Sequence, residues 1–223
     1  ILIGLVGSEM CIRDSLGAAN LAKIAHQAGI EEDIAEDTTY NILGINGITV
    51  WDLAQGHSTI ANDGVKNTLH IVDTVLTSDG SKELYKTAQE NQQVFDANDC
   101  HLVQKAMQGT TTYGTAAGVS ARLGRQVAGK SGTANDEKAA SFVGYTPQLL
   151  NVWAIWNPAE DGSAQEVPPF AGYGVSSTGY PSHLFEEFMS LALQNQEVMT
   201  FTEPTDNGKI GGPAGTWGTG AQK

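Results

Sequence analysis

The chain has 223 residues, 40% of them hydrophobic, which is enough to bury the core of one domain or most of one. Its formal net charge of −13 argues against nucleic-acid binding and against docking on an anionic membrane, because both need clustered Lys and Arg. Cys11 and Cys100 lack the paired spacing of metal sites and disulfides, so we expect no metal and no cofactor. No apolar run approaches the roughly 20 residues that span a bilayer, so we expect no membrane segment within this chain.

The N-terminal segment, residues 1–15, is set apart by its composition. The hexapeptide MCIRDS at its end matches the translation of a transposon-end sequencing adapter, and no basic leader precedes the apolar run at the start. We therefore expect residues 1–15 to be non-native and the fold to be entered near Leu16. The alternative is a genuine hydrophobic strand and turn.

Two helices are predicted in the first third of the chain. Apolar residues recur at helical spacing over residues 21–28, just ahead of Gly29, which suits a helix end. Thr49 and Asp52 have the spacing of a capping box, so a second helix is expected to begin there and to end before Gly64.

A hairpin and a third helix are predicted next. Residues 69–77 are apolar and β-branched, residues 78–81 have turn chemistry, and residues 83–86 can return as the partner strand. The third helix is expected to end at Gly109. The run GTTTYGTAAG, residues 109–118, is too rich in Gly and Thr for a regular helix and is predicted to be a loop lining a site.

Three strands and a last helix complete the predicted core. The strands cover residues 126–133, 141–145 and 149–156, and their short connections make them antiparallel. The last helix has Ser182 as its expected N-cap. Residues 201–223 are rich in Gly and lack a hydrophobic period, which predicts a flexible tail.

The histidines and tryptophans are expected to be structural. The five histidines are scattered without metal-ligand spacing, and His57 on the buried side of its helix is expected to be a satisfied core residue. We expect Trp51, Trp153 and Trp156 to pack in the core rather than to stack on sugar.

The residues GRQVAGKS, 124–131, fit the phosphate-loop pattern G-x-x-x-x-G-K-[ST]. A phosphate loop needs a helix that begins at the Lys, whereas Gly132, Thr133 and the turn residues 135–136 disfavour one here. The best later strand ends in Asn157 rather than in the acidic residue that would help to hold magnesium. We therefore interpret the match as a coincidence of spacing.

KSGT is better described as part of a strand, in which Lys130 and Gly132 point to one side and Ser131 and Thr133 to the other. An ammonium, two hydroxyls and a bare Gly at a strand edge suit an extended peptide that ends in a carboxylate. Lys130 would supply charge, the hydroxyls would form hydrogen bonds, and Gly132 would leave room. On the tetrapeptide alone, a solvated strand end with no function is the favoured alternative.

The surroundings of KSGT change that weighting. KSGTANDEKAASFVGYTPQL, residues 130–149, resembles the third active-site motif and following strand of penicillin-binding proteins, whose K-[ST]-G accompanies S-x-x-K and S-x-N. The segments LGAANLAKIAHQAGI, GITVWDLAQGHSTIANDGV, MQGTTTYGTAAGVSARLGRQVAGKSGTA and GYPSHLFEEFMSLAL resemble other parts of the family in the same order, so the resemblance covers about residues 16–193. It implies an α/β (α+β) fold of the serine β-lactamase and transpeptidase type, an antiparallel sheet flanked by helices, here incomplete.

The resemblance also implies a chemistry. In the family a serine attacks the penultimate D-Ala carbonyl of a peptidoglycan stem peptide, the last D-Ala leaves, and the acyl group passes to an amine; β-lactam antibiotics acylate the same serine. By this resemblance Lys130 provides positive charge and joins the proton network, and the Ser131 and Thr133 hydroxyls bind the substrate carboxylate. The Thr133 N–H would be one of two oxyanion donors.

The chain departs from the family pattern in one respect: no S-x-x-K occurs in it, and the S-x-N site would fall where the adapter-like residues lie. We therefore expect residues 16–200 to be a partial transpeptidase domain that is inactive by itself. The parent would be a membrane-anchored, extracytoplasmic enzyme of the bifunctional class A type. The alternatives are a non-catalytic peptidoglycan-binding module and a D,D-carboxypeptidase or β-lactamase-like hydrolase.

Overall fold

The computed structural model describes residues 16–38, 44, 46–169, 172–173 and 179–206, so the adapter-like segment and residues 207–223 of the predicted tail lie outside the described residues. The elements are, in chain order, α2 (Ala18–Ala28), α3 (Val50–Ala61), β1 (Val65–Lys66), β2 (Thr74–Leu76), β3 (Glu83–Lys86), β4 (Gln92–Gln93), α4 (Ala97–Thr112), α5 (Val119–Leu123), β5 (Ala128–Thr133), η2 (Asn135–Glu137), β6 (Ala139–Tyr145), β7 (Leu150–Pro158), β8 (Ala164–Gln165) and α6 (Tyr180–Ala192).

The main sheet has four antiparallel strands in the order β5-β6-β7-β8. The three predicted strands are confirmed, and β8, which is only two residues long, is too short for its sequence to predict it. β5 pairs with β6 on one side only and is therefore an edge strand. The KSGT residues occupy the second half of this edge.

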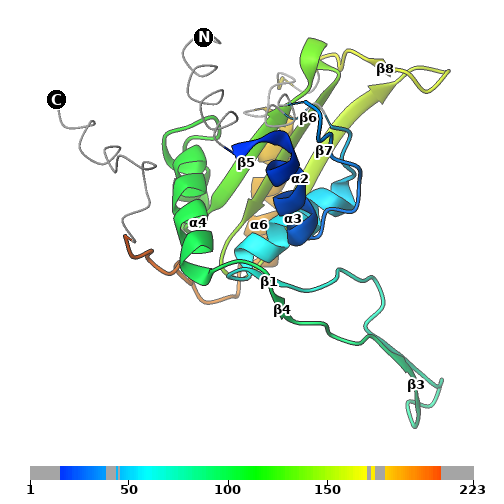
Figure 1. Ribbon diagram of the computed structural model, residues 1–223. Coiled ribbons are helices and arrows are strands. Elements are labelled where there is room, and N and C mark those ends of the chain that lie inside the picture. The colour runs from blue at the N-terminus through cyan, green and yellow to red at the C-terminus, as the bar shows by residue number, and fades with distance from the viewer. Residues whose placement is uncertain (1–15, 39–43, 45, 170–171, 174–178, 207–223) are drawn as a thin grey trace.

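Helices cover both faces of the sheet, as the predicted fold class requires (Figure 1). Behind the sheet, α6 brings the Phe185 ring to 5.1 Å from the ring of Phe142 on β6. Gly144 on the same strand allows this approach, because a Cβ there would lie 2.7 Å from the Phe185 ring. In front of the sheet lie α2, α3 and α4, and there Tyr145 packs edge-on against Phe201 at 5.8 Å.

Of the two hydrogen bonds of the capping box predicted for α3, the one from the Asp52 N–H to the Thr49 hydroxyl is confirmed. The Thr49 hydroxyl accepts a hydrogen bond from the Asp52 N–H at 3.0 Å. The buried Asp52 carboxylate accepts from the backbone N–H groups of Glu31 and Glu32, at 3.2 and 3.3 Å, instead of returning to the cap residue. The start of α3 is thereby tied to the connection that follows α2.

The predicted end of the third helix is wrong by nearly one turn. α4 continues past Gly109 to Thr112, so it takes in the first residues of the run that was expected to be a loop. The Thr111 hydroxyl donates to the Val127 carbonyl at 2.5 Å, at the start of the β5 edge. This tertiary bond holds the last turn in place, and local composition does not contain it.

The predicted N-cap of the last helix is also wrong. α6 begins at Tyr180 after Gly179, with a proline in its first turn, where the missing N–H costs nothing. The Ser182 hydroxyl therefore donates to the Gly179 carbonyl at 3.0 Å instead of accepting from the helix.

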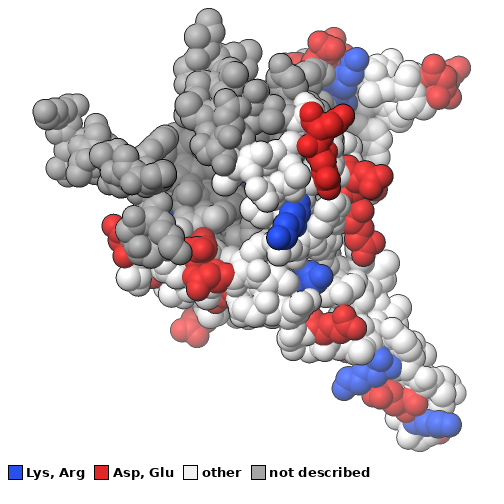
Figure 2. All heavy atoms as spheres, in the orientation of Figure 1, with Lys and Arg blue, Asp and Glu red and all other residues white. Residues whose placement is uncertain are grey.

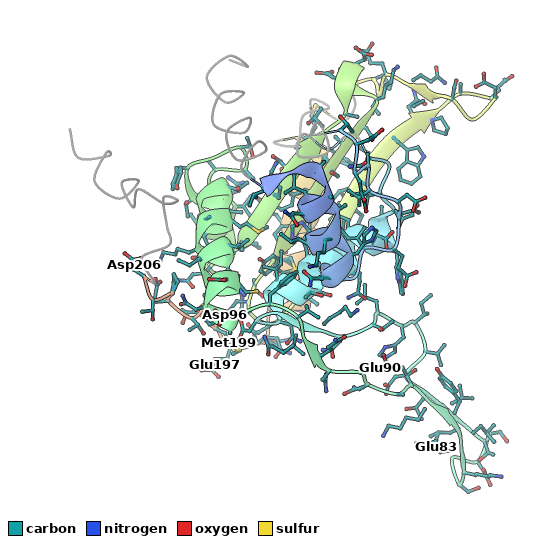
Figure 3. All side chains as sticks on the ribbon, in the orientation of Figure 1. Glu83, Glu90, Asp96, Glu197, Met199 and Asp206 are labelled. Carbon is teal, nitrogen blue, oxygen red and sulfur yellow. The ribbon has the colours of Figure 1, made fainter. Side chains whose placement is uncertain are left out.

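Residues 201–206 pack against the body, although the tail was expected to begin at residue 201. Phe201 is 8% exposed, and its N–H donates to the Gln126 side chain at 2.8 Å. The Thr205 N–H donates to the Asn98 side chain at 2.7 Å. Figure 3 shows this segment running past the Asp96 end of α4. A single buried aromatic residue in a polar segment produces no hydrophobic periodicity, so the sequence did not predict that this segment packs against the body.

The predicted hairpin at residues 69–86 is confirmed as β2 and β3, and it forms an arm that projects away from the body (Figure 1). All the residues of both strands are exposed. Apolar composition was correct as a strand signal here and gave no indication of burial.

The expected core positions of two tryptophans are wrong. Trp153 packs against the α6-side core, whereas Trp51 and Trp156 are 47% and 63% exposed. Trp153 and Trp156 are three residues apart in one strand, so their side chains must point to opposite faces of the sheet.

Candidate functional site

The KSGT residues lie in an extended edge strand and not in a loop that leads into a helix. β5 runs without interruption from Ala128 to Thr133, and a tight turn, η2, follows it. A phosphate loop would need a helix N-terminus at Lys130, so the structure excludes that interpretation.

The hydrogen-bond phase of β5 determines which backbone groups face the open side. The Ala134 N–H donates to the Ala139 carbonyl at 2.8 Å, just beyond the ladder that pairs Thr133 with Ala140. Facing pairs alternate along an antiparallel ladder, so the N–H and C=O groups of Ser131 and Thr133 point away from β6. Neither of these two N–H groups has a partner among the residues that the structure describes.

The first part of the same edge is closed by side chains. The outward N–H of Val127 donates to the Ser120 hydroxyl at 3.3 Å, and the outward carbonyl of Val127 accepts from Thr111 at 2.5 Å. The open stretch therefore begins beyond these contacts and includes Ser131 and Thr133. An extended peptide could pair with the backbone there.

Exposure along KSGT does not follow the predicted alternation of its side chains. Lys130 and Thr133 are exposed, whereas Ser131 is buried, although Ser131 and Thr133 share one side of the strand. The Lys130 Nζ donates to the Ser131 carbonyl at 2.5 Å, so the ammonium lies at the open edge. The Ser131 Oγ lies 2.8 Å from the Thr115 Oγ1. Thr115 belongs to the GT-rich run that was predicted to line a site, and no single threonine in that run was predicted to matter.

Gly132 leaves room for a side chain of the neighbouring strand. A Cβ at Gly132 would lie 2.6 Å from the Ser141 Oγ on β6, so a larger residue would force the Ser141 hydroxyl to turn away.

His57 on α3 is a half-buried group whose Nδ1 is enclosed and whose ring lies close enough to Lys130 to feel its charge. Burial, with the Lys130 ammonium as a second cause, lowers the pKa of His57 to about 4. The imidazole is therefore neutral at pH 7, and it adds no second positive charge near the Lys130 ammonium. Its Nδ1 has no hydrogen-bond partner within the described part of the chain, so the expectation of a satisfied core histidine is wrong on this atom.

Neither a reactive Cys100 thiol nor a metal-binding group accompanies the strand in the described ranges. Burial raises the pKa of the Cys100 thiol to about 11, which makes it a poor nucleophile. Across residues 16–206, leaving out the gaps given above, no three His, Cys, Asp or Glu side chains gather in a metal-binding group. None of the helices described has the length and apolar character needed to cross a membrane. On the face drawn in Figure 2, Lys and Arg do not form a patch over the described surface.

Comparison with known proteins identifies a family. The profile of the penicillin binding protein transpeptidase domain matches residues 12–170. Penicillin-binding protein 1A of Mycolicibacterium smegmatis is 30% identical over 218 residues, which are 89% of this chain and 27% of that protein. Penicillin-binding protein 1A of Neisseria flavescens is 32% identical over 179 residues, which are 75% of this chain and 21% of that protein. The chain thus spans about a quarter of the length of these relatives.

Solved structures agree on the fold. The penicillin-binding protein PonA1 from Mycobacterium tuberculosis superposes with a TM-score of 0.65 at 27% identity, over 85% of this chain and 53% of that chain. Penicillin-binding protein 1A from Haemophilus influenzae gives a TM-score of 0.70 at 15% identity, over 88% of this chain and 34% of that chain. The second similarity is one of fold alone.

Proposed function

Since the chain belongs to the penicillin-binding protein transpeptidase domain family, we propose that the open edge of β5 binds the D-Ala-D-Ala end of a peptidoglycan stem peptide. The observation that carries the proposal is the placement of three groups on one edge. The backbone groups of Ser131 and Thr133 point outward, and the Lys130 ammonium lies beside them. An extended peptide can pair with the first two and place its terminal carboxylate near the third.

Each residue of the motif has a proposed role. Lys130 attracts the carboxylate with a charge-assisted hydrogen bond. Because His57 is neutral at pH 7, the imidazole adds nothing to this positive charge. The hydroxyls of Ser131 and Thr133 bind the carboxylate directly. The Thr133 N–H, which has no partner among the described residues, stabilises negative charge that develops on the attacked carbonyl oxygen.

The chemical step requires a serine that this chain does not contain, because no S-x-x-K occurs in its 223 residues. In a longer protein that supplies it, the serine oxygen forms an ester with the penultimate D-Ala as the C–N bond to the last D-Ala breaks. An amine of a second peptide then displaces the serine. The 223-residue chain by itself binds the peptide and the β-lactam but is not acylated. We propose an extracytoplasmic, membrane-anchored location for the longer protein, where stem peptides are cross-linked.

A titration tests the binding site. The probe is diacetyl-L-Lys-D-Ala-D-Ala, followed by NMR shifts of the backbone amides of the full chain. Saturable shifts are expected at Ser131 and Thr133. Lys130→Ala should weaken binding by about 10-fold or more, because hydrogen bonds to charged groups contribute about 1.5–3 kcal/mol. Lys82→Ala on the exposed arm is the matched control and should change nothing. Shifts that avoid β5, or equal effects of the two variants, would overturn the proposed site.

A labelling experiment tests the claim of inactivity. Incubation with fluorescent penicillin should leave no covalently labelled band after denaturation. A labelled band would show that the chain contains a nucleophile and would remove the claim, whatever the titration gives.

A further inference from the structure

Ser131 is the enclosed hydroxyl of the motif, and its partner is a residue outside the motif. Ser131 is 8% exposed, and its Oγ lies 2.8 Å from the Oγ1 of Thr115. Thr115 itself is exposed and lies in the turn between α4 and α5. We infer that Thr115 is a positioning residue, which directs the Ser131 proton toward the substrate carboxylate. The inference rests on the proposed function.

The number of hydroxyl protons determines what the Thr115–Ser131 pair can offer to a carboxylate. A hydroxyl has one proton to donate and two lone pairs that accept, whereas an ionised carboxylate only accepts. In the Thr115–Ser131 pair one hydroxyl donates and the other accepts. If Ser131 donates to Thr115, it has no proton left for a carboxylate. If Thr115 donates to Ser131, the Ser131 proton is free to point to the ligand, and the two bonds in series strengthen each other.

The turn that carries Thr115 is held firmly enough to act on Ser131. The Ala116 N–H donates to the Thr110 carbonyl at 2.9 Å, and the Gly118 N–H donates to the Thr111 carbonyl at 3.0 Å. Ala116 is 4% exposed and belongs to the core on the α6 side. The Thr115 backbone is thus fixed between a helix end and a core residue, which keeps the residue beside β5.

Two variants and two ligands separate this role from simple packing. Thr115→Val removes the hydroxyl with little change of shape, and Thr115→Ser restores it. The ligands are diacetyl-L-Lys-D-Ala-D-Ala and its C-terminal primary amide, which can donate as well as accept. A loosened turn would weaken both ligands equally. Loss of the bond that orients the Ser131 hydroxyl should weaken only the carboxylate ligand, because a carboxylate can only accept, whereas the amide can also donate to Ser131.

The expected result is selective. Thr115→Val leaves the Ser131 proton in place but removes the bond that orients it, so it should weaken the carboxylate ligand about 2- to 3-fold, the lower part of the range for one neutral hydrogen bond, and leave the affinity for the amide ligand unchanged. Thr115→Ser should bind both ligands as the unaltered chain does. In a Ser131→Ala background, Thr115→Val should produce no further loss, since the group that it directs is gone.

Several outcomes overturn the inference. Equal losses for both ligands, no loss for either, failure of Thr115→Ser to restore binding, or full additivity with Ser131→Ala would each do so. Backbone amide spectra check the fold of each variant, and Thr115→Ala serves as a second deletion if the valine variant perturbs β5. If the unaltered chain binds neither ligand at β5, the proposed function fails together with this inference. Binding that ignores Thr115 overturns the inference alone.

Discussion

Two antiparallel hairpins of the molecule have the same secondary structure and different sources of stability. In β5–β6 the residues Ala128, Phe142 and Tyr145 are 0% exposed. In the arm, β2–β3, Val75 is 40% and Tyr85 is 51% exposed. The first hairpin is held by the core on both faces. The second must be held by its own strand pairs and its turn, and such an isolated hairpin is only marginally stable.

The two turns differ in the same way. In the arm, the Asp79 carboxylate accepts from the Thr77 hydroxyl at 2.5 Å and from the Ser81 N–H at 3.1 Å, so the turn bonds within itself. After β5, Asp136 and Glu137 both have left-handed backbones, with φ of 56° and 53°, which is unfavourable for non-glycine residues. The Val167 N–H donates to the Glu137 carbonyl at 3.0 Å, so a distant segment holds this turn beside the open edge of β5.

The largest expected effect is on the free energy of unfolding. Phe185→Ala should lower it by about 3–5 kcal/mol, because the ring is fully buried against Phe142 and its removal leaves a cavity. Tyr85→Ala in the arm should lower it by about 1 kcal/mol or less, the size of one cross-strand contact. Urea denaturation of the full chain measures both values. Similar losses would show that the arm packs against apolar surface in solution.

The contrast between the hairpins also explains what the sequence could predict. The arm was located from residues 69–86 because strand, turn and return strand carry their signals locally. The three core strands were located for the same reason, and KSGT was placed in one of them because its flanks exclude a helix. The features that were missed depend on distant partners. Examples are the last turn of α4, held by Thr111 on Val127, and the segment anchored by Phe201.

The features of the candidate site also separate into those that the local sequence predicts and those that depend on distant partners. The residue types at Lys130, Ser131 and Thr133 and their alternation follow from the tetrapeptide and the strand period. The hydrogen-bond phase that turns the Thr133 N–H outward is a property of the pairing with β6, and the sequence does not contain it. The partners Thr115 and His57 come from other elements, so only the three-dimensional structure brings them to the strand.

The second prediction concerns pH and the body of the molecule. The pKa of His57 is about 4 in the folded chain, below the 6.5 of an exposed histidine, because burial disfavours the charged ring. The unfolded chain therefore binds a proton first as the pH falls. The stabilisation is complete above pH 6.5 and is lost between pH 6.5 and 4, by roughly 3 kcal/mol in total.

Unfolding free energies at a series of pH values, with His57→Gln as the comparison, measure this effect. The variant should lack the part of the pH dependence that falls in this window. If the two chains have parallel curves, His57 titrates normally and is not buried beside Lys130 in solution.

The smallest effect is expected in the arm, where a pKa is shifted without burial. The pKa of Asp79 is lowered to about 2, first by the Thr77 hydroxyl and then by the Ser81 N–H and hydroxyl, although the carboxylate is fully exposed. Because the hydrogen bonds that lower this pKa lie within the turn, a peptide of residues 70–87 should have an Asp79 pKa below 3.8 by NMR titration, to the extent that the turn forms in it. Thr77→Val should raise it toward 3.8, whereas Thr74→Val, outside the turn, should leave it unchanged.

The direction of the Asp79 pKa shift determines how the stability of the arm changes with acid. A lowered carboxyl pKa means that the ionised form is the one the folded turn favours, so the turn is fully supported above pH 3.8 and loses this support as the pH falls through 2. An ordinary pKa in the peptide, with a low one in the full chain, would mean that the body organises the turn. The arm would then depend on tertiary contacts as the β5–β6 turn does. The two turns would no longer differ in whether local or distant contacts stabilise them.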